Sequence, residues 1–183
     1  MSLVIEPMRG RHVTAVEAVD AQCYSRPWSN ATWRRELAGT DRIHLVGRVG
    51  DTVVGHAGLL WVMDEVHITT VAVHPDREGE GIGTRLVVAL LESAGADGAR
   101  SATLEVRAAD RRTQRLYGRL GFQPAGIRAD YYSSPTDDAV VMWLHELGSA
   151  PVVERLAAVR AIFTDGEPSS IAPSSVASDR SPR

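Results

Sequence analysis

The chain has 183 residues and a mass of 19.8 kDa, which suits one domain of ordinary size and is too short for two. Its 23 acidic residues outnumber its 20 basic residues, counted as lysine plus arginine, and the formal charge of −3 argues against a protein that coats nucleic acid. Those basic residues are all arginines, so the chain can neither form a Schiff base with pyridoxal phosphate nor supply the lysine of a P-loop.

The first half of the chain predicts a strand, two helices and a meander of three further strands. Ser29 is a typical N-cap for the second helix, and Gly50-Asp51 forms a two-residue turn between the first two strands of the meander. We expect these elements at Leu3–Pro7 (strand), Thr14–Tyr24 and Asn30–Leu37 (helices), and His44–Val49, Thr52–Trp61 and Glu65–His74 (strands).

The following part of the chain predicts helices that alternate with strands. Gly121 ends the second of these helices. We expect a helix at Gly83–Ala94, a strand at Ala102–Val106, a helix at Arg111–Leu120 and two final strands, the last at Val140–Leu144. This order differs from that of a regular doubly wound fold. It predicts an α/β (α+β) sandwich in which helices flank one mixed, mostly antiparallel sheet.

The composition changes after Gly148, and this change suggests how the chain is organised. Residues 1–147 read as one domain. Residues 148–163 predict a short amphipathic helix, with its apolar positions Val152, Leu156, Val159 and Phe163 at helical spacing. Residues 164–183 are rich in serine and proline and hold few apolar side chains, so we expect a disordered tail.

The most informative segment is a glycine-rich loop between a strand and a helix. The strand ends with Val71-Ala72-Val73, and Gly79, Gly81 and Gly83 follow at alternate positions. Glycines before a helix N-terminus expose backbone N–H groups to an anion such as a phosphate. A Rossmann fingerprint would need G-x-G-x-x-G close behind the strand. A plain glycine turn before a helix is the remaining alternative.

The loop and its surroundings resemble the Gcn5-related N-acetyltransferase (GNAT) superfamily over about residues 3–147. Residues 71–75 resemble its fourth strand, residues 78–83 its Q/R-x-x-G-x-G/A signature, and residues 104–107 and 116–122 its fifth strand and fourth helix. With residues 26–29 and 127–132, they are similar to the RimI branch. The resemblance implies the GNAT fold, acetyl-CoA as co-substrate, and transfer to the N-terminal alanine of small-subunit ribosomal protein number eighteen.

The resemblance also implies the residues that hold acetyl-CoA. The strand backbone of Val71, Ala72 and Val73 would hold the acetyl and pantetheine portion. The pyrophosphate would meet the N–H groups of Gly79, Glu80, Gly81, Ile82, Gly83 and Thr84. Asp110 stands where the family has asparagine, and we expect it to cap the following helix. Glu78 and Glu80 bring negative charge toward the pyrophosphate, which we expect Arg77 and Arg85 to offset.

Two residues carry the chemistry that the resemblance implies. Glu105 matches the glutamate that accepts the proton of the amine through water, and Tyr117 matches the tyrosine that protonates the departing thiolate. A backbone N–H, expected to be that of Val73, would meet the carbonyl oxygen. Without the resemblance, alternation would favour a surface glutamate at 105 and a core aromatic at 117.

Aromatic residues are expected to line the groove for the acceptor peptide. They are Trp28, Tyr131 and Tyr132, although each could serve packing alone. We expect no metal site, because the six histidines show no ligand spacing. Cys23, the single cysteine, is expected to be a buried small hydrophobe.

The compartment and the partners follow from similar observations. One cysteine fits a reducing cytoplasm, no apolar run is long enough to span a bilayer, and the N-terminal residues do not read as a signal peptide. We therefore expect a cytoplasmic enzyme whose partner is the N-terminus of a ribosomal protein, without direct contact to nucleic acid or membrane. The resemblance implies that a monomer suffices to build the site.

Two alternative functions stay open. The first is an enzyme that acetylates a small amine or a lysine; a small amine would need acidic residues along the groove, for which Asp64, Glu65 and Asp130 are available. A catalytically silent acetyl-CoA-binding module would explain Glu78, Glu80 and Asp110. Replacing Glu105 with glutamine separates the enzyme from the silent module, because only an enzyme has turnover to lose.

Overall fold

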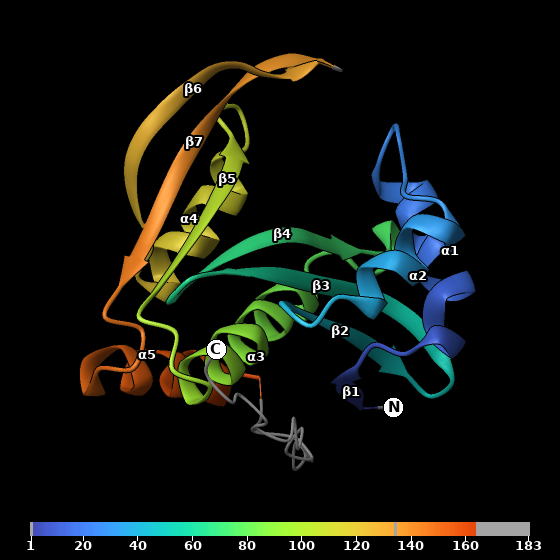
Figure 1. The fold of residues 1–183 in the computed structure, drawn as a ribbon, viewed down its shortest axis with the longest axis horizontal. Coiled ribbons are helices and arrows are strands. Elements are labelled where there is room, and N and C mark those ends of the chain that lie inside the picture. Colours follow the sequence, from blue (N-terminus) through green and yellow to red (C-terminus); the bar gives the residue numbers. More distant parts are fainter. Residues whose placement is uncertain (1, 134, 164–183) are drawn as a thin grey trace, which may run out of the picture.

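A computed structural model describes residues 2–133 and 135–163, and within these ranges seven strands form one sheet in the order β1-β2-β3-β4-β5-β7-β6 (Figure 1). The strands are β1 (Leu3–Pro7), β2 (Arg42–Val49), β3 (Thr52–Val62), β4 (Glu65–Val73), β5 (Ser101–Arg107), β6 (Gln123–Ser133) and β7 (Thr136–His145). The helices are α1 (Val13–Cys23), α2 (Asn30–Ala38), α3 (Ile82–Ala96), α4 (Arg111–Leu120) and α5 (Ala150–Ala161), with short 3-10 turns at Gly10–His12 and Pro75–Arg77.

The sheet confirms the predicted fold class. All strand pairs in the described residues are antiparallel except β4 with β5, which are parallel. The Ser29 hydroxyl accepts a hydrogen bond from the Thr32 N–H and caps α2. The turn Gly50-Asp51 joins β2 and β3 as predicted.

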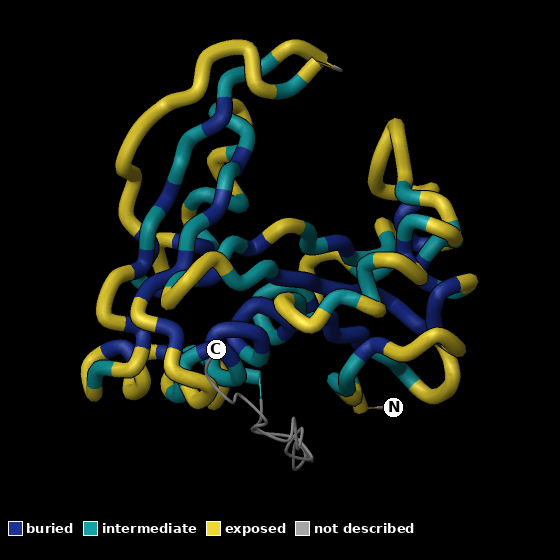
Figure 2. Tube along the Cα trace, in the orientation of Figure 1, coloured by how far each residue is buried: buried dark blue, intermediate teal, exposed yellow. Residues whose placement is uncertain are grey.

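The last hairpin is longer than the sequence suggested. The prediction gave β6 no bounds and began β7 at Val140, whereas β7 begins at Thr136. β6 lies at the edge of the sheet and is exposed along almost all of its length (Figure 2). An exposed edge strand has no buried face, so its sequence lacks the alternation that predicts strands.

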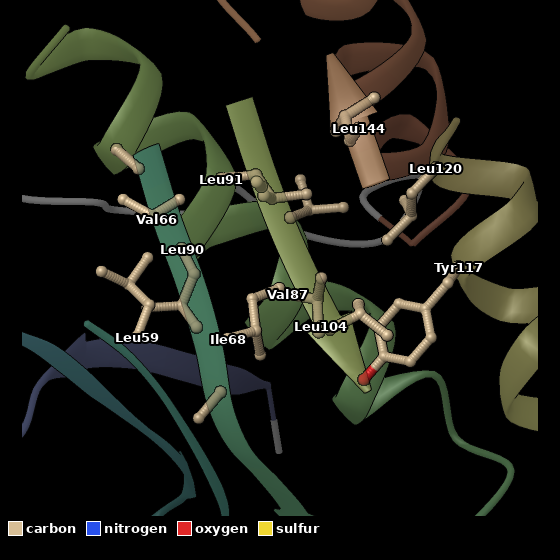
Figure 3. Close-up of a cluster of buried hydrophobic side chains, with 14 of the residues drawn as sticks. Leu59, Val66, Ile68, Val87, Leu90, Leu91, Leu104, Tyr117, Leu120 and Leu144 are labelled. Carbon is tan, nitrogen blue, oxygen red and sulfur yellow. The ribbon is translucent and has the colours of Figure 1, made fainter. Parts of the chain in front are cut away.

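Two apolar clusters cover the two faces of the sheet. The larger one packs α3, α4 and α5 against the sheet, and Figure 3 shows part of it around Leu90, Leu91 and Leu104. The smaller one packs α1 and α2 on the opposite face around Trp33, which is fully buried. On that opposite face the cluster includes residues of β2, β3 and β4 but, among the described residues, none of β5, β6 or β7.

An irregularity in β4 changes which side chains face each cluster. Gly58 pairs with Thr70 but Leu59 pairs with Ile68, so Thr69 is an extra residue and forms a β-bulge. Before the bulge, Val66 and Ile68 point into the larger cluster, and after it Val71 and Val73 do so. The bulge thus resets the alternation just before the segment that leads into the glycine loop.

Candidate active site

The strands β4 and β5 separate part of the way along the sheet. They pair only from Glu65 with Ser101 to His67 with Thr103, and both strands then continue without pairing to each other, so they diverge (Figure 1). A cleft of about 930 Å³ follows the free part of β4, the glycine loop, and the facing sides of α3 and α4. Such a volume lies within the range of small-molecule and cofactor sites.

The free edge of β4 presents backbone groups to this cleft. The Tyr24 hydroxyl donates to the Val71 carbonyl at 3.0 Å, and the Cys23 thiol donates to the Val73 carbonyl at 3.2 Å. Because the N–H and C=O of one strand residue point to the same side, the N–H groups of Val71 and Val73 also face away from β3. Backbone donors are therefore available where the resemblance expected an acetyl group to lie.

The expectation that Cys23 is buried was wrong. Cys23 is exposed at the end of α1, and its residue lines the cleft beside Tyr24. A free carbonyl at the separated edge of β4 needs a donor, and the thiol supplies one. Cys23 is thus a weak hydrogen-bond donor at the cleft and does not pack in an apolar core.

The glycine loop has the geometry of an anion cradle. Gly79 and Gly81 adopt left-handed conformations with φ of 86° and 77°, which glycine adopts without steric cost. Gly81 is the N-cap of α3, and no side chain caps this helix or places an acid in its first turn. Ile82, Gly83 and Thr84 of that first turn line the cleft. The positive end of the helix dipole therefore faces the cleft, as an anion such as a pyrophosphate requires.

The carboxylates beside the loop are paired with arginines. Glu80 lies 3.2 Å from Arg77, and Glu78 lies 3.8 Å from Arg112. Glu80 is absent from the cleft lining, unlike every other residue predicted to contact the cofactor. The expected role of Arg85 was wrong, because its guanidinium donates to the Leu3 carbonyl, and Arg112 of α4 is the second arginine near the loop.

On the other side of the cleft, α4 presents Asp110 and Tyr117. The Asp110 carboxylate accepts a hydrogen bond of 2.9 Å from the Thr113 N–H and caps the helix, as predicted. Tyr117 is buried and points toward Leu104 of β5 (Figure 3). Its burial, followed by the nearness of Tyr24 and Tyr132, raises the pKa of the Tyr117 phenol, which therefore stays protonated at neutral pH.

Glu105 lies on β5 at the point where the strands have separated. Leu104 and Val106 point into the larger apolar cluster, so the Glu105 side chain points to the opposite face. One carboxylate oxygen lies 3.0 Å from His67 Nε2 and the other 3.2 Å from Arg128 Nη1, while the side chain is only 7% exposed. Glu105 is therefore an enclosed carboxylate held between two basic side chains, and the alternative of a surface glutamate does not apply.

The three predicted groove aromatics fall into two groups. Trp28 packs edge-on against Trp33 at 4.9 Å, on the α1–α2 side. Tyr131 and Tyr132 pack edge-on at 5.1 Å on β6, and the Tyr132 hydroxyl donates to the Glu105 carbonyl at 3.4 Å. Tyr132 thus lies next to Glu105, whereas Trp28 lies on the α1–α2 side, and neither Glu105 nor any of the three aromatics is among the residues that line the cleft.

Sequence reasoning missed four residues at or beside the site: Tyr24, His67, Arg128 and Phe163. Tyr24 and Phe163 line the cleft, and His67 and Arg128 hold Glu105. His67 is diagonal to Glu105, because His67 pairs with Thr103, two residues before it on β5. The closeness of His67 to Glu105 could have been predicted only by assuming the parallel register between β4 and β5. No group of metal-ligating side chains occurs among the described residues.

Comparison with known proteins identifies a consistent set of relatives. The model of the acetyltransferase (GNAT) family matches residues 13–122. A protein of Bacillus subtilis (strain 168), provisionally named a [ribosomal protein bS18]-alanine N-acetyltransferase, is 32% identical over 141 residues, which cover 76% of this chain and 93% of the relative. The N-alpha-acetyltransferase RimI of Mycobacterium tuberculosis (strain ATCC 25618 / H37Rv) is 37% identical over 122 residues, covering 63% of this chain and 74% of the relative.

Solved structures agree with these relatives. The crystal structure of the ribosomal-protein-S18-alanine N-acetyltransferase from Escherichia coli superposes with a TM-score of 0.73 at 26% identity, covering 79% of this chain and 94% of that one. The Arabidopsis thaliana NAA60 structure, solved with a bisubstrate analogue, has a TM-score of 0.71 at 17% identity, covers 81% of this chain and all of that one (100%), and shares the fold.

Proposed function

The chain belongs to the GNAT family of acetyltransferases, and we propose that it transfers the acetyl group of acetyl-CoA to the N-terminal alanine of ribosomal protein bS18. The family match and the names of the relatives support the enzyme class and the acceptor. An acceptor of this kind would place the reaction in the cytoplasm. Among the described residues, no helix is both long and apolar enough to cross a membrane.

One observation carries the proposal: an enclosed carboxylate stands beside separated strands whose free edge and glycine loop can receive a thioester cofactor. The donors present fit acetyl-CoA, because the loop before α3 suits its pyrophosphate and the free edge of β4 suits the amide groups of its pantetheine arm. Val71, Ala72 and Val73 would hold that arm, and Gly79, Glu80, Gly81, Ile82, Gly83, Thr84 and Asp110 would surround the pyrophosphate. Bound there, acetyl-CoA would supply an acetyl group activated as a thioester.

Glu105 would accept the proton that the amine must lose before it attacks. An α-amino group has a pKa of about 7.7–8.0, whereas a lysine side chain has a pKa of about 10.4. A carboxylate can complete the deprotonation of an α-amino group that is already partly neutral, but is a poor base for lysine. His67 and Arg128 would fix the orientation of this carboxylate. The proposal therefore favours a protein N-terminus over an internal lysine.

Val73 and Tyr117 would handle the charges that develop on the acetyl group and on the leaving group. The Val73 N–H would stabilise negative charge on the carbonyl oxygen. The Tyr117 phenol would donate its proton to the departing thiolate, and its raised pKa ensures that the proton is present to be donated. Trp28, Tyr131 and Tyr132 would line the path of the acceptor peptide.

Acceptors that are small amines find less support. Asp64 forms an ion pair with Arg100, and Glu65 accepts a hydrogen bond from the Ser101 hydroxyl. Glu65 lies where β4 is still paired with β5, and Asp64 directly precedes it, so both acids lie away from the free end of β4 that lines the cleft. Asp130 is exposed on β6, where its N–H donates to the Asp138 carboxylate.

The test uses two peptides that start with the first residues of bS18, contain one internal lysine, and differ only in a free or a blocked N-terminal alanine. We expect acetyl-CoA turnover and a mass increase of one acetyl group only on the free peptide. Equal product on both peptides would show that lysine is the acceptor. No product, despite binding of CoA, would leave the small-amine enzyme or the silent module.

A further inference from the structure

The helix α5 is anchored on the domain. Val152 and Leu156 are buried in the larger apolar cluster, and Val159 is packed against it. Arg160 at the end of the helix lies 3.1 Å from Glu92 of α3. Because α5 is fixed by core side chains, the position of its C-terminal end relative to α3 is fixed as well.

That end of α5 reaches the glycine loop. Val159, Ile162 and Phe163 line the same cleft as Gly81 and Thr84. The Phe163 ring packs directly on Gly81, since a methyl group at this position would lie 2.1 Å from Phe163 Cε1. The ring is only half-buried, and Ile162 is 72% exposed. Apolar surface therefore borders the anion cradle on the side of α5.

The order of groups along the cleft indicates which part of a ligand would meet this surface. One end holds the Val71 and Val73 backbone and Tyr117, where the thioester would lie, and the loop before α3 follows. A cofactor that places its acyl group at the first end and its pyrophosphate on the loop must carry its nucleotide past the loop. Phe163, which packs on Gly81 of that loop, and Ile162 line the cleft, as does Arg112 of α4. An aromatic face is the usual partner of a base, which it binds by stacking.

We propose that the end of α5 is part of the cofactor site, and that Phe163, supported by Ile162, binds the adenosine end of acetyl-CoA. The inference rests on the proposed function, because it takes acetyl-CoA as the ligand of the cleft. α5 lies beyond residues 13–122, which the family model matches. The segment after the last strand is thereby a nucleotide-binding element and not only an appendage of the domain.

The experiment measures the Kd of CoA and of 4′-phosphopantetheine by calorimetry, for the full chain and for Phe163→Ala. Phosphopantetheine keeps the pantetheine arm and one phosphate but lacks the adenosine. We expect Phe163→Ala to weaken CoA binding at least fivefold, the lower end of what the loss of one stacked base produces, and to leave phosphopantetheine binding within twofold. Phe163→Trp should restore CoA binding. Val153→Ala, on the exposed face of α5, is the matched control and should change neither ligand.

The outcomes separate the inference from the proposed function. Equal weakening of both ligands by Phe163→Ala, or no change in either, would overturn the role of Phe163 in binding adenosine. Tighter CoA binding by Phe163→Ala would also overturn it, since the ring would then obstruct the cradle. Failure of the unmodified chain to bind CoA would instead refute the proposed function, and this inference with it. Melting temperatures of all variants verify that each one is folded.

Discussion

The two sides of the proposed site are built from different parts of the polypeptide. On the proposed cofactor side, most of the groups that would bind are backbone N–H groups, presented by the free edge of β4 and by the loop with Gly79 and Gly81 in left-handed conformations. On the acceptor side, the groups are side chains: Glu105 is held by His67 and Arg128. Exchange of the Glu105 side chain should therefore be severe, whereas on the cofactor side a change to the backbone of the loop should weaken binding more than the loss of a side chain such as Phe163.

The largest effect is expected for Glu105→Gln on the acceptor side. Glutamine keeps the size of the side chain but cannot accept the proton of the amine, and loss of a general base typically costs about 10²–10⁴ in rate. We expect kcat for the free N-terminal alanine peptide to fall at least 100-fold, with the Kd of CoA unchanged. Calorimetry and single-turnover kinetics measure the two quantities. Glu154→Gln, exposed on α5, serves as the control.

The opposite result, with turnover kept and CoA binding lost, would contradict the assignment of Glu105 to the acceptor side. If Glu105→Gln kept its turnover but lost CoA, the carboxylate would serve the cofactor side, and the base would have to be sought elsewhere. His67→Gln refines the test, because His67 is a positioning residue. It should lower kcat less than Glu105→Gln does, without changing the Kd of CoA, since the carboxylate itself and its contact with Arg128 remain.

A buried histidine beneath α2 makes the stability of the fold sensitive to acid. His44 packs against Trp33 at 5.4 Å, and neither of its ring nitrogens has a hydrogen-bond partner in the part of the chain that the structure describes. Burial lowers the pKa of His44 from 6.5 to about 4, and the nearby Glu36 only partly opposes this shift. The folded protein therefore binds fewer protons at His44 than the unfolded chain between these two pH values, so stability falls as pH falls through this window.

The expected size of this loss is about 3 kcal/mol by pH 4, on the basis of 1.36 kcal/mol per pKa unit. Urea unfolding at pH 7 and at pH 4 measures it, with His44→Gln as the comparison because glutamine does not titrate. The unmodified chain should lose about 3 kcal/mol more than this variant. His145→Gln, exposed at the end of β7, controls for histidines in general. Equal losses in the unmodified chain and in His44→Gln would contradict a buried neutral His44.

Elements with periodic apolar residues could be predicted from the sequence. The β2–β3 turn, the cap of α2 and the cap of α4 depend on residues next to one another in the chain, and each has its predicted role. The fold class followed from the order of the elements. What local patterns do not encode is an exposed edge, which is why β6 had no predicted bounds.

The missed site residues depend on long-range register. The bulge at Thr69 is visible in the sequence only as a change in the spacing of the apolar residues Val66, Ile68 and Val71. The pairing of His67 with Thr103 brings His67 to Glu105, and no local pattern specifies that pairing. Likewise, the spacing of apolar residues placed Phe163 on the apolar face of a helix. That spacing does not specify which loop the last residue of the helix contacts, and Phe163 packs on Gly81.

On the cofactor side, Gly81→Ala is expected to have the largest effect. Alanine at a φ of 77° is strained by about 1–3 kcal/mol, and its methyl group would displace the Phe163 ring. We expect the Kd of CoA to rise at least tenfold. Gly118→Ala in α4, where an added methyl group meets no atom within 4 Å, should bind CoA normally. Normal CoA binding by Gly81→Ala would show that the loop tolerates side chains and would remove the contrast between the two sides.

The smallest effect is expected for Glu80→Gln, although this residue carries a negative charge within the loop itself. Glu80 is half-exposed, lies outside the cleft lining and is 3.2 Å from Arg77. Exposed ion pairs of this kind contribute about 0–1 kcal/mol. Removing the carboxylate frees Arg77, so CoA should bind slightly more tightly, by less than about threefold at 0.15 M salt, and the gain should vanish at 1 M salt. A gain of tenfold or more, measured by calorimetry, would mean that the side chain of Glu80 opposes the pyrophosphate directly. The cofactor side would then depend on side-chain charge as well as on backbone geometry.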